Sequence, residues 1–259
     1  MKQNKILPPV YLILLLITIV LLGMTTISGA RATLSVNSEE YVSNMQVRKM
    51  GIAIYDVPSE TILAEKYFAE GAWQKDGEGK VFTDISGEGF IIGKRYDENV
   101  TVANVGTMAE YVRVVVYKYW VDSQGNKRTD LDPELIHIVF DDEAWYLDES
   151  SVTEERSILY YRGILDAPEE DALSMTPSFV HSVMLDDGIR SLYISRDGTD
   201  ENGNPIIEYI YDYDGMHFII EIEADSVQTH NALDSIKSAW GVSDETDAGK
   251  AVLEALGVN

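Results

Sequence analysis

Residues 99–122, NVTVANVGTMAEYVRVVVYKYWVD, constrain the fold more than any other part of the sequence. From Tyr111 onward the side chains alternate with the period of two that is typical of a β-strand. One face carries Val112, Val114, Val116 and Trp120, and the other carries Tyr111, Arg113, Val115, Tyr117 and Tyr119. Because apolar and aromatic residues fill both faces, we expect a central strand with one face in a core and the other partly covered. Asn104-Val105-Gly106 predicts a turn or bulge before this strand.

Other strand patterns follow at short spacing along the chain. We expect strands over residues 45–55, 85–92, 135–140, 158–164 and 178–185. Residues 122–126 predict a turn, which would make 135–140 the return strand of the hairpin. Trp145 falls in an acidic loop or a short strand.

Turn residues predict two hairpins in the last third of the chain. Residues 192–194 and 206–213 flank the polar loop 197–205, DGTDENGNP, which indicates a long hairpin. Asp214-Gly215, between residues 206–213 and 216–222, is the strongest two-residue hairpin signal in the sequence.

Helical patterns are confined mainly to the C-terminus. Val227, Leu233, Ile236 and Trp240 recur near helical spacing, so we expect a helix that Asp225 or Ser226 begins and Gly241 ends. A second helix is expected over residues 247–256, after Ser243 or Thr246 and before Gly257. A short helix capped by Ser59 is the prediction for the segment through Ala64 and Tyr67.

These elements predict an all-β protein, a jelly-roll-like antiparallel β-sandwich of roughly nine strands with one or two short C-terminal helices. We expect three parts: a signal peptide over residues 1–32, a sandwich domain over 33–242 and a helical tail over 243–259.

The first 32 residues have the features of an export signal. Lys2 and Lys5 precede an apolar run at 10–24, and the small residues Ser28-Gly29-Ala30 follow it. A run of this length is short for a membrane span, so a cleaved signal peptide is favoured and an uncleaved anchor is the alternative. We expect a secreted chain, at the cell surface or in a matrix, that meets the membrane only through this leader and meets a signal peptidase during export.

Charge and cysteine content exclude several classes of function. The formal net charge is −24, and it becomes −27 without the leader, which contains Lys2, Lys5, Arg31 and no acid. So acidic a chain disfavours nucleic acid as a partner, because phosphate binding needs clustered Lys and Arg. The chain has no cysteine, so it can form neither a disulfide nor a thiolate metal site.

No motif in the sequence indicates catalysis. The four histidines, His137, His181, His217 and His230, lack zinc-peptidase spacing, and no nucleophile elbow, P-loop or dinucleotide fingerprint occurs. We therefore predict no catalytic residues, no cofactor site and no enzyme activity.

Three weaker patterns concern binding. The loop containing Asp197, Asp200 and Asn202 resembles a calcium loop, but with Gly203 at the sixth position Gly198 and Tyr209 occupy positions that require carboxylates. A plain hairpin loop is favoured, with a weak calcium site as the alternative. Arg113, between two valines, predicts a buried ion pair. Four strand tyrosines could pack normally or stack on a carbohydrate: Tyr117, Tyr119, Tyr160 and Tyr161.

The order of several short motifs resembles the TasA/camelysin group of exported matrix-fibre proteins. These motifs are the hydrophobic leader, the strand pattern at 45–55, Val102-x-Asn104-x-Gly106 before Tyr111-Val112-Arg113-Val114, Trp145, Tyr160-Tyr161, and residues 224–228 running to Ala239-Trp240-Gly241. The resemblance implies a jelly-roll domain of the cell surface or biofilm matrix that assembles into fibres by strand addition, and a leader cut by a SipW-type signal peptidase. Arg31-Ala32-Thr33-Leu34-Ser35 stands where the group has a Phe-Ser/Thr-Asp element, which leaves the processing peptidase open.

The leading hypothesis is a non-enzymatic structural protein that self-associates, with residues 32–44 as the donor strand. The alternatives are a secreted module that binds glycan or calcium and, less favoured, a secreted peptidase. The acidic composition predicts that salt, divalent cations or acid toward the sequence pI of about 4.3 favour assembly.

Overall fold

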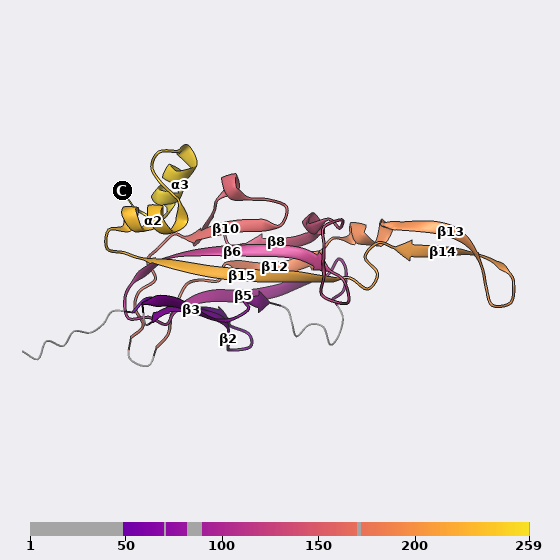
Figure 1. Ribbon diagram of the computed structural model, residues 1–259, viewed down its shortest axis with the longest axis horizontal. Helices are drawn as coiled ribbons and strands as arrows, with labels where there is room; N and C mark the ends of the chain where they lie inside the picture. The colour runs from indigo at the N-terminus through magenta and orange to yellow at the C-terminus, as the bar shows by residue number, and fades with distance from the viewer. Residues whose placement is uncertain (1–48, 70, 82–89, 170–171, 259) are drawn as a thin grey trace, which may run out of the picture. The chain divides into compact units, whose positions relative to one another are not determined.

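The computed structural model describes residues 49–69, 71–81, 90–169 and 172–258. These residues form an antiparallel β-sandwich with two short helices near the C-terminus (Figure 1), which confirms the predicted fold class. The predicted leader and donor segment lie outside the described residues.

The first sheet has seven strands in the order β3-β2-β1-β5-β12-β8, with β11 also paired to β5. Its strands are β1 (Gly51–Asp56), β2 (Thr61–Ala69), β3 (Ala72–Gly77), β5 (Arg95–Asn104), β8 (Ile136–Phe140), β11 (Ser174–Met175) and β12 (Val180–Leu185).

The second sheet has six strands in the order β4-β15-β6-β10-β9, with β7 also paired to β6. Its strands are β4 (Lys80–Val81), β6 (Glu110–Val121), β7 (Lys127–Arg128), β9 (Trp145–Leu147), β10 (Arg156–Tyr161) and β15 (His217–Gln228). Consecutive strands pass repeatedly from one sheet to the other, as they do in a jelly roll.

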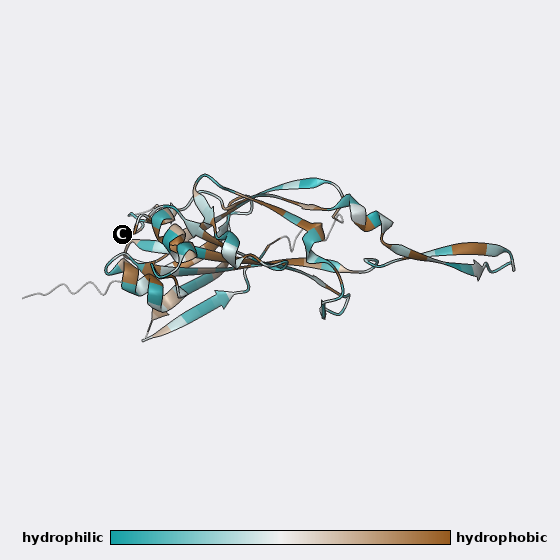
Figure 2. Cartoon of the chain, turned by 90° about the horizontal axis from the view of Figure 1, so that it is seen from above, coloured by the Kyte–Doolittle hydropathy of each residue, from teal (hydrophilic) through white to brown (hydrophobic). Residues whose placement is uncertain are grey.

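A separate two-stranded sheet consists of β13 (Tyr193–Thr199) and β14 (Pro205–Tyr211), so the long hairpin predicted around residues 197–205 is confirmed. The described chain also has three short 3-10 turns: η2 (Pro133–Leu135), η3 (Glu149–Ser151) and η4 (Asp187–Ser191). Figure 2 shows brown, hydrophobic segments in this hairpin as well as in the strands of the two large sheets.

Strand β6 is central to its sheet, between β15 and β10, as its alternating sequence predicts. Val112 and Val114 are fully buried in the core between the sheets, where they pack with residues such as Ile52, Val102 and Ile222. The opposite face of β6 is covered around Tyr111 by a second apolar cluster. Both faces of this strand are therefore used, which explains its unbroken apolar sequence.

The second cluster is formed by the C-terminal helices, α2 (Ala232–Trp240) and α3 (Asp247–Ala255). Gly241 ends α2 with a φ of 72°, and the Thr246 hydroxyl accepts the N–H of Gly249 at 3.0 Å to begin α3, so both predicted caps are confirmed. Ile236 of α2 and Val252 of α3 pack against the outer face of the second sheet.

The break that Asn104-Val105-Gly106 predicts lies between β5 and β6. Asn104 is fully buried, and its side-chain amide donates to the Met108 and Asp166 carbonyls at 2.8 and 3.0 Å. Its Oδ1 accepts the N–H of Gly106 at 2.8 Å. The Asn104 side chain thus provides hydrogen-bond partners for backbone groups of the loop that connects one sheet to the other.

The structure contradicts the short helix predicted after Ser59. Residues Thr61–Ala69 form strand β2, which pairs with β1 on one side and β3 on the other. Two strand ladders satisfy more backbone groups here than an isolated turn of helix would, and this pairing cannot be inferred from local helix signals.

Two predicted strand connections are also wrong. Strand β8 does not pair with β6, because β7 pairs there instead. After η2, which begins at Pro133, the chain continues as β8, and this strand pairs with β12 in the other sheet. Strand β15 does not pair with β14 across Asp214-Gly215. It pairs with β6 along all twelve of its residues and so contributes Ile220 and Ile222 to the core.

Three further boundaries differ from the prediction. Residues up to Gln228, which we expected to begin the first helix, belong to β15, and α2 starts at Ala232. The strand expected over 85–92 lies partly outside the described residues, and Phe90 to Ile92 are not in a strand. The described chain contains fifteen strands rather than about nine, because several strands have only two or three residues.

Candidate functional site

The outer edge of β15 includes a stretch of six residues that has no partner strand in the described sheets. On one side β15 pairs with β6 throughout, whereas on the other side β4 pairs only with Ile220 and Glu221. The Ile222 N–H donates to the Gly79 carbonyl at 2.9 Å, and no described strand pairs with β15 beyond this point. We call residues 223–228 the free edge of β15.

Gly79 explains why the pairing ends there. Its φ is 65°, and a Cβ atom at this position would collide with the Ile222 carbonyl oxygen. Glycine therefore lets the chain approach β15 closely and then turn away to β3. The chain's departure at Gly79 leaves the rest of the edge uncovered.

The other outer edges of the two large sheets differ from the free edge of β15 in exposure, length or hydrogen bonding. Strand β3 has an outer edge of equal length, but all six of its residues are exposed, so this edge borders no buried apolar surface. Strand β9 has three residues. On β8, the Ile136 carbonyl already accepts a hydrogen bond from the Lys118 ammonium at 2.8 Å. The free edge of β15 is therefore the best candidate for adding a strand.

Two hollows line this free edge and together form what we call the β15 groove. The first, of about 100 Å³, lies beside Ala224 and Asp225, with Ile52 and Lys66 on the opposite wall. The second, of about 420 Å³, lies beside Ser226 and Val227 and continues to Trp73 and helix α2. Apolar side chains of β1 and β2 thus face a strand edge that has unused backbone groups.

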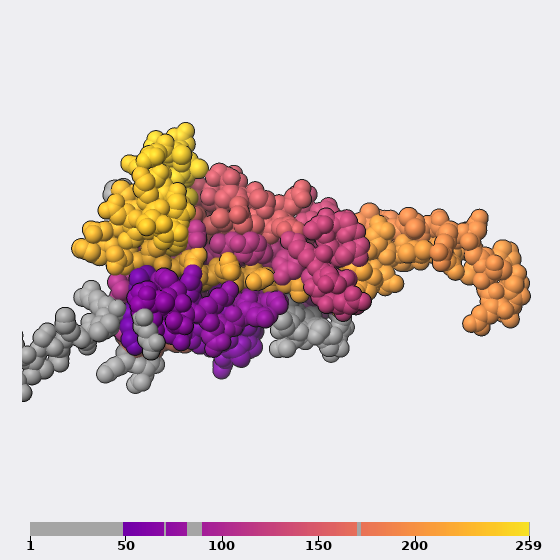
Figure 3. Space-filling model, viewed as in Figure 1, coloured from indigo at the N-terminus to yellow at the C-terminus, as the bar shows by residue number. Residues whose placement is uncertain are grey.

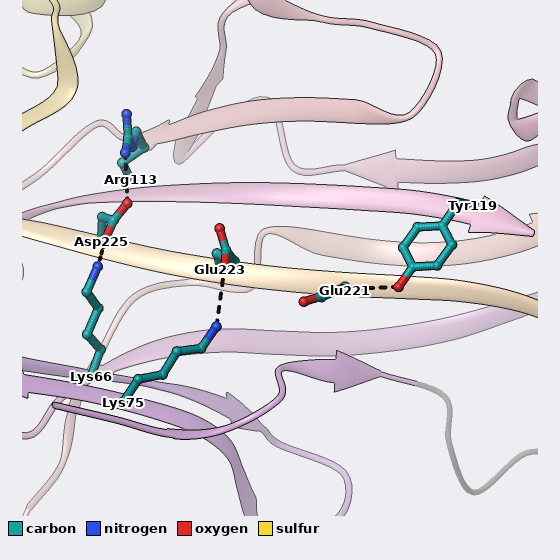
Figure 4. Close-up of polar contacts among 7 residues, drawn as sticks. All are labelled: Lys66, Lys75, Arg113, Tyr119, Glu221, Glu223 and Asp225. Atoms are coloured by element: carbon teal, nitrogen blue, oxygen red, sulfur yellow. Dashed lines mark hydrogen bonds and ion pairs between the residues drawn. The ribbon is translucent and has the colours of Figure 1, made fainter. Parts of the chain in front are cut away.

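Ion pairs connect β15 to the strands across the groove (Figure 4). Asp225 lies between Arg113, at 2.7 Å, and Lys66, which forms a short ion pair with it. Glu223 contacts Lys75 at 3.3 Å. Arg113 has the acid partner that the sequence predicts, and it is largely but not fully buried, with 16% of its side chain exposed.

These pairs shift the ionisation of Asp225. Burial alone would raise the pKa of this carboxyl, but hydrogen bonds from Lys66 and Arg113 hold its pKa below the ordinary value. Asp225 therefore stays charged and keeps β2 fixed to β15. Further along β15, Glu221 accepts the Tyr119 hydroxyl at 3.1 Å, and burial together with this bond raises the pKa of Tyr119.

A buried carboxyl group lies at the end of the groove where β1 begins. Glu110 is fully buried, and its Oε1 accepts the N–H of Gly51 at 3.0 Å. Burial raises the pKa of Glu110 to about 7, although the nearby Ser226 hydroxyl and the hydrogen bond from the Gly51 N–H partly oppose the shift. Met50, directly before Gly51, lines the second hollow, so the chain enters β1 beside the groove.

The calcium candidates lie in the β13–β14 hairpin. Asp200 Oδ1 accepts the N–H groups of Asn202 and Asn204 at 2.9 and 2.7 Å, and its Oδ2 accepts the Asn204 amide at 2.9 Å. Asp200 therefore stabilises its own turn. Asp197 belongs to β13 and lies opposite Ile207. Within the described ranges, no three His, Asp or Glu side chains lie close enough together to hold a metal ion.

The four tyrosines considered for carbohydrate stacking do not all share one face, because Tyr117 and Tyr119 lie on one face of β6, partly buried, whereas Tyr160 and Tyr161 point to opposite faces of β10. Tyr160 is buried against Trp240, with 5.6 Å between ring centroids, whereas Tyr161 packs on Trp145 and the core between the sheets. Among the histidines, His137 pairs with Asp186 at 2.8 Å and His181 with Asp141 at 3.1 Å. The structure thus separates these candidates.

Comparison of the chain with protein-family models, curated proteins and solved structures finds no match. In the part of the chain that the structure describes, no helix combines the length and the hydrophobicity needed to cross a membrane.

Proposed function

We propose that this chain is an exported structural protein of the cell surface or extracellular matrix, and that copies assemble into fibres by strand addition. The β15 groove is the acceptor, and residues 32–44 of another copy are the donor strand. The protein has no catalytic role in this proposal, and its leader is removed by a signal peptidase during export.

The free edge of β15 is the observation that carries this proposal. A strand that pairs with one neighbour leaves every second N–H and C=O group pointing outward. Because the Ile222 N–H points away from β6 to Gly79, the N–H groups of Ala224 and Ser226 point to the same side. An added strand could form backbone hydrogen bonds with Ala224 and Ser226 and pack its side chains on the apolar wall of the groove, as extended peptides do when they add to sheets.

The donor segment has a matching pattern. Leu34 and Val36 alternate with Thr33, Ser35 and Asn37, so in an extended strand the two apolar side chains share one face. That face can enter the hollow beside Ile52 and Ala224, while the polar face remains in solvent. The free edge spans about 20 Å at roughly 3.3 Å per residue, well within the reach of the thirteen residues 32–44.

Charge would control this assembly. Copies with a formal charge of −24 or below repel one another at low ionic strength, so association requires screening or partial neutralisation. The Lys75–Glu223 and Lys66–Asp225 pairs both bridge the groove, so an added strand must displace them, and salt weakens them because they are partly exposed. Both effects favour strand addition as salt increases.

The test uses two matched variants of the purified exported chain. Leu34→Lys/Val36→Lys puts two charges on the apolar face of the donor, and Ser35→Lys/Asn37→Lys puts the same two charges on its polar face. Light scattering and electron microscopy in a salt series should show assembly of the second variant and of the unmodified chain, but not of the first. Equal assembly of both variants, or full assembly after deletion of residues 33–44, would contradict strand donation.

A further inference from the structure

The β13–β14 hairpin exposes apolar side chains on both of its faces. In the register of the hairpin, residues directly opposite each other lie on the same face: Tyr193 with Tyr211, Ser195 with Tyr209, and Asp197 with Ile207. This face, which we call the tyrosine face, therefore collects three tyrosines and one isoleucine. The other face contains Ile194, Ile206, Ile210 and the Arg196–Glu208 ion pair.

These side chains are exposed to an unusual degree. On the tyrosine face, Tyr193, Tyr209 and Tyr211 are 43%, 53% and 46% exposed, and Ile207 is 60% exposed. Figure 3 shows the hairpin in orange beyond the strands of the two large sheets. A hairpin of two strands is only marginally stable in water, and it gains stability when an apolar face is covered. The tyrosine face therefore has the composition of a contact surface.

We propose that a second copy of this chain covers the tyrosine face, with the two hairpins packed face to face and antiparallel about a two-fold axis. This contact does not involve the donor segment, and it does not rest on the proposed function.

The distribution of charge favours this partner and this orientation. The chain has a net charge of −24, but residues 193–196 and 205–211 contain only Arg196 and Glu208, which neutralise each other at 2.5 Å. Asp200 and Glu201 lie at the tip, Asp197 lies on the tyrosine face near the tip, and no cation occurs among residues 197–204. Apart from Asp197, the two strands therefore add no net charge to the contact.

An antiparallel arrangement also keeps the acidic tips apart. Seven strand residues span about 23 Å at roughly 3.3 Å each, which exceeds the Debye length of about 8–10 Å at physiological salt. A parallel arrangement would place both tips side by side and bring six carboxylates together. The acidic tip equally disfavours insertion of the hairpin into an anionic membrane.

The exposed area predicts a weak, reversible contact. Each of the four side chains has a total surface of roughly 150–250 Å² and is about half exposed, so together they contribute roughly 400 Å² of apolar surface per copy. This is about half of the roughly 800 Å² per partner in a standard stable interface. We therefore expect the dimer to depend on protein concentration.

The absence of cysteine from the chain allows a direct test by disulfide cross-linking. Single substitutions on the tyrosine face, Ser195→Cys, Ile207→Cys and Tyr209→Cys, place a thiol near the expected axis. Ile194→Cys and Ile210→Cys are the matched controls, because they are neighbouring exposed residues on the opposite face. After mild oxidation of the purified exported chain, we expect dimers with at least one tyrosine-face cysteine and several-fold fewer with either control.

Two results would overturn the proposal: no dimer from any tyrosine-face cysteine, or equal yields from both faces. The experiment is repeated after deletion of residues 33–44, which removes the donor strand. Persistence of the same face-specific dimer supports the hairpin contact even if fibre formation fails. Its loss would show that the contact only follows from strand addition and would also overturn the proposal. Sedimentation of Tyr209→Lys should show a lower average mass than the unmodified chain at equal concentration, and an unchanged mass counts against the contact.

Discussion

Glu110 Oε1 accepts the backbone N–H of Gly51 at 3.0 Å, and this joins the first residue of β6 to the first residue of β1. The two strands belong to different sheets. Because Glu110 is fully buried, this hydrogen bond connects the sheets at the end of the β15 groove without access to water.

Glu110 makes stability depend on pH in a predictable direction. Burial raises its pKa from 4.5 to about 7 in the folded chain, so the folded state binds a proton more tightly than the unfolded state. The free energy of unfolding should therefore fall as pH rises from about 4.5 to 7, and Glu98, whose pKa burial and Asp56 also raise to about 7, acts in the same direction. Glu110→Gln should flatten this dependence and raise the unfolding free energy at pH 8 by on the order of 1–3 kcal/mol. Urea denaturation at pH 5 and pH 8 checks this; an unchanged pH slope in the variant would refute the assignment.

The partly buried Arg113–Asp225 pair should matter more for stability than an exposed pair. Arg113→Met leaves Asp225 with only Lys66 as a cationic partner and removes the guanidinium from its position 5.3 Å from the Trp240 ring. We expect a loss of about 2–4 kcal/mol, because it leaves a partly buried carboxylate under-compensated. The control is Arg196→Met in the hairpin, where the arginine is 64% exposed and the loss should stay below about 0.5 kcal/mol. Equal losses in urea denaturation would contradict this difference.

Asn104 should be among the most sensitive polar positions in the described chain. Asn104→Ala leaves the Met108 and Asp166 carbonyls and the Gly106 N–H without their side-chain partner in a buried loop. We expect a loss of about 2–4 kcal/mol. Asn126→Ala is the control, because the Asn126 amide donates to the Asp122 carboxylate at an exposed position, and this substitution should cost less than about 1 kcal/mol. Calorimetric melting temperatures measure both, and similar shifts would argue against a structural role specific to Asn104.

The sequence predicts individual strands better than their partners. The alternation from Tyr111 to Trp120 identifies β6, its central position and its two covered faces, because these properties depend on local composition. The turn at Asp214-Gly215 exists, yet β15 pairs with β6, more than ninety residues earlier in the chain. Local turn signals cannot report such pairing, because the energy of the distant ladder and of the core side chains decides it.

The candidate site shows the same limit. Asp225 and Ser226 suggest a helix start in the sequence, and only the pairing of β15 with β6 shows that they lie on a strand edge. The groove exists because β4 begins only at Lys80 and the chain before it turns away at Gly79, and the sequence near β15 indicates neither fact. In contrast, the exposed hairpin could be suspected from the sequence: Ile206, Ile207, Tyr209, Ile210 and Tyr211 put apolar residues on both faces of one strand.

Hydrogen exchange at the free edge of β15 tests strand addition most directly. The amides of Ala224 and Ser226 point toward the groove, whereas those of Glu223 and Asp225 already pair with β6 and serve as internal controls. Conditions that assemble the chain should slow exchange at Ala224 and Ser226 by at least about tenfold, change the controls little, and have no effect after deletion of residues 33–44. Assembly without added protection at Ala224 and Ser226 would contradict the account.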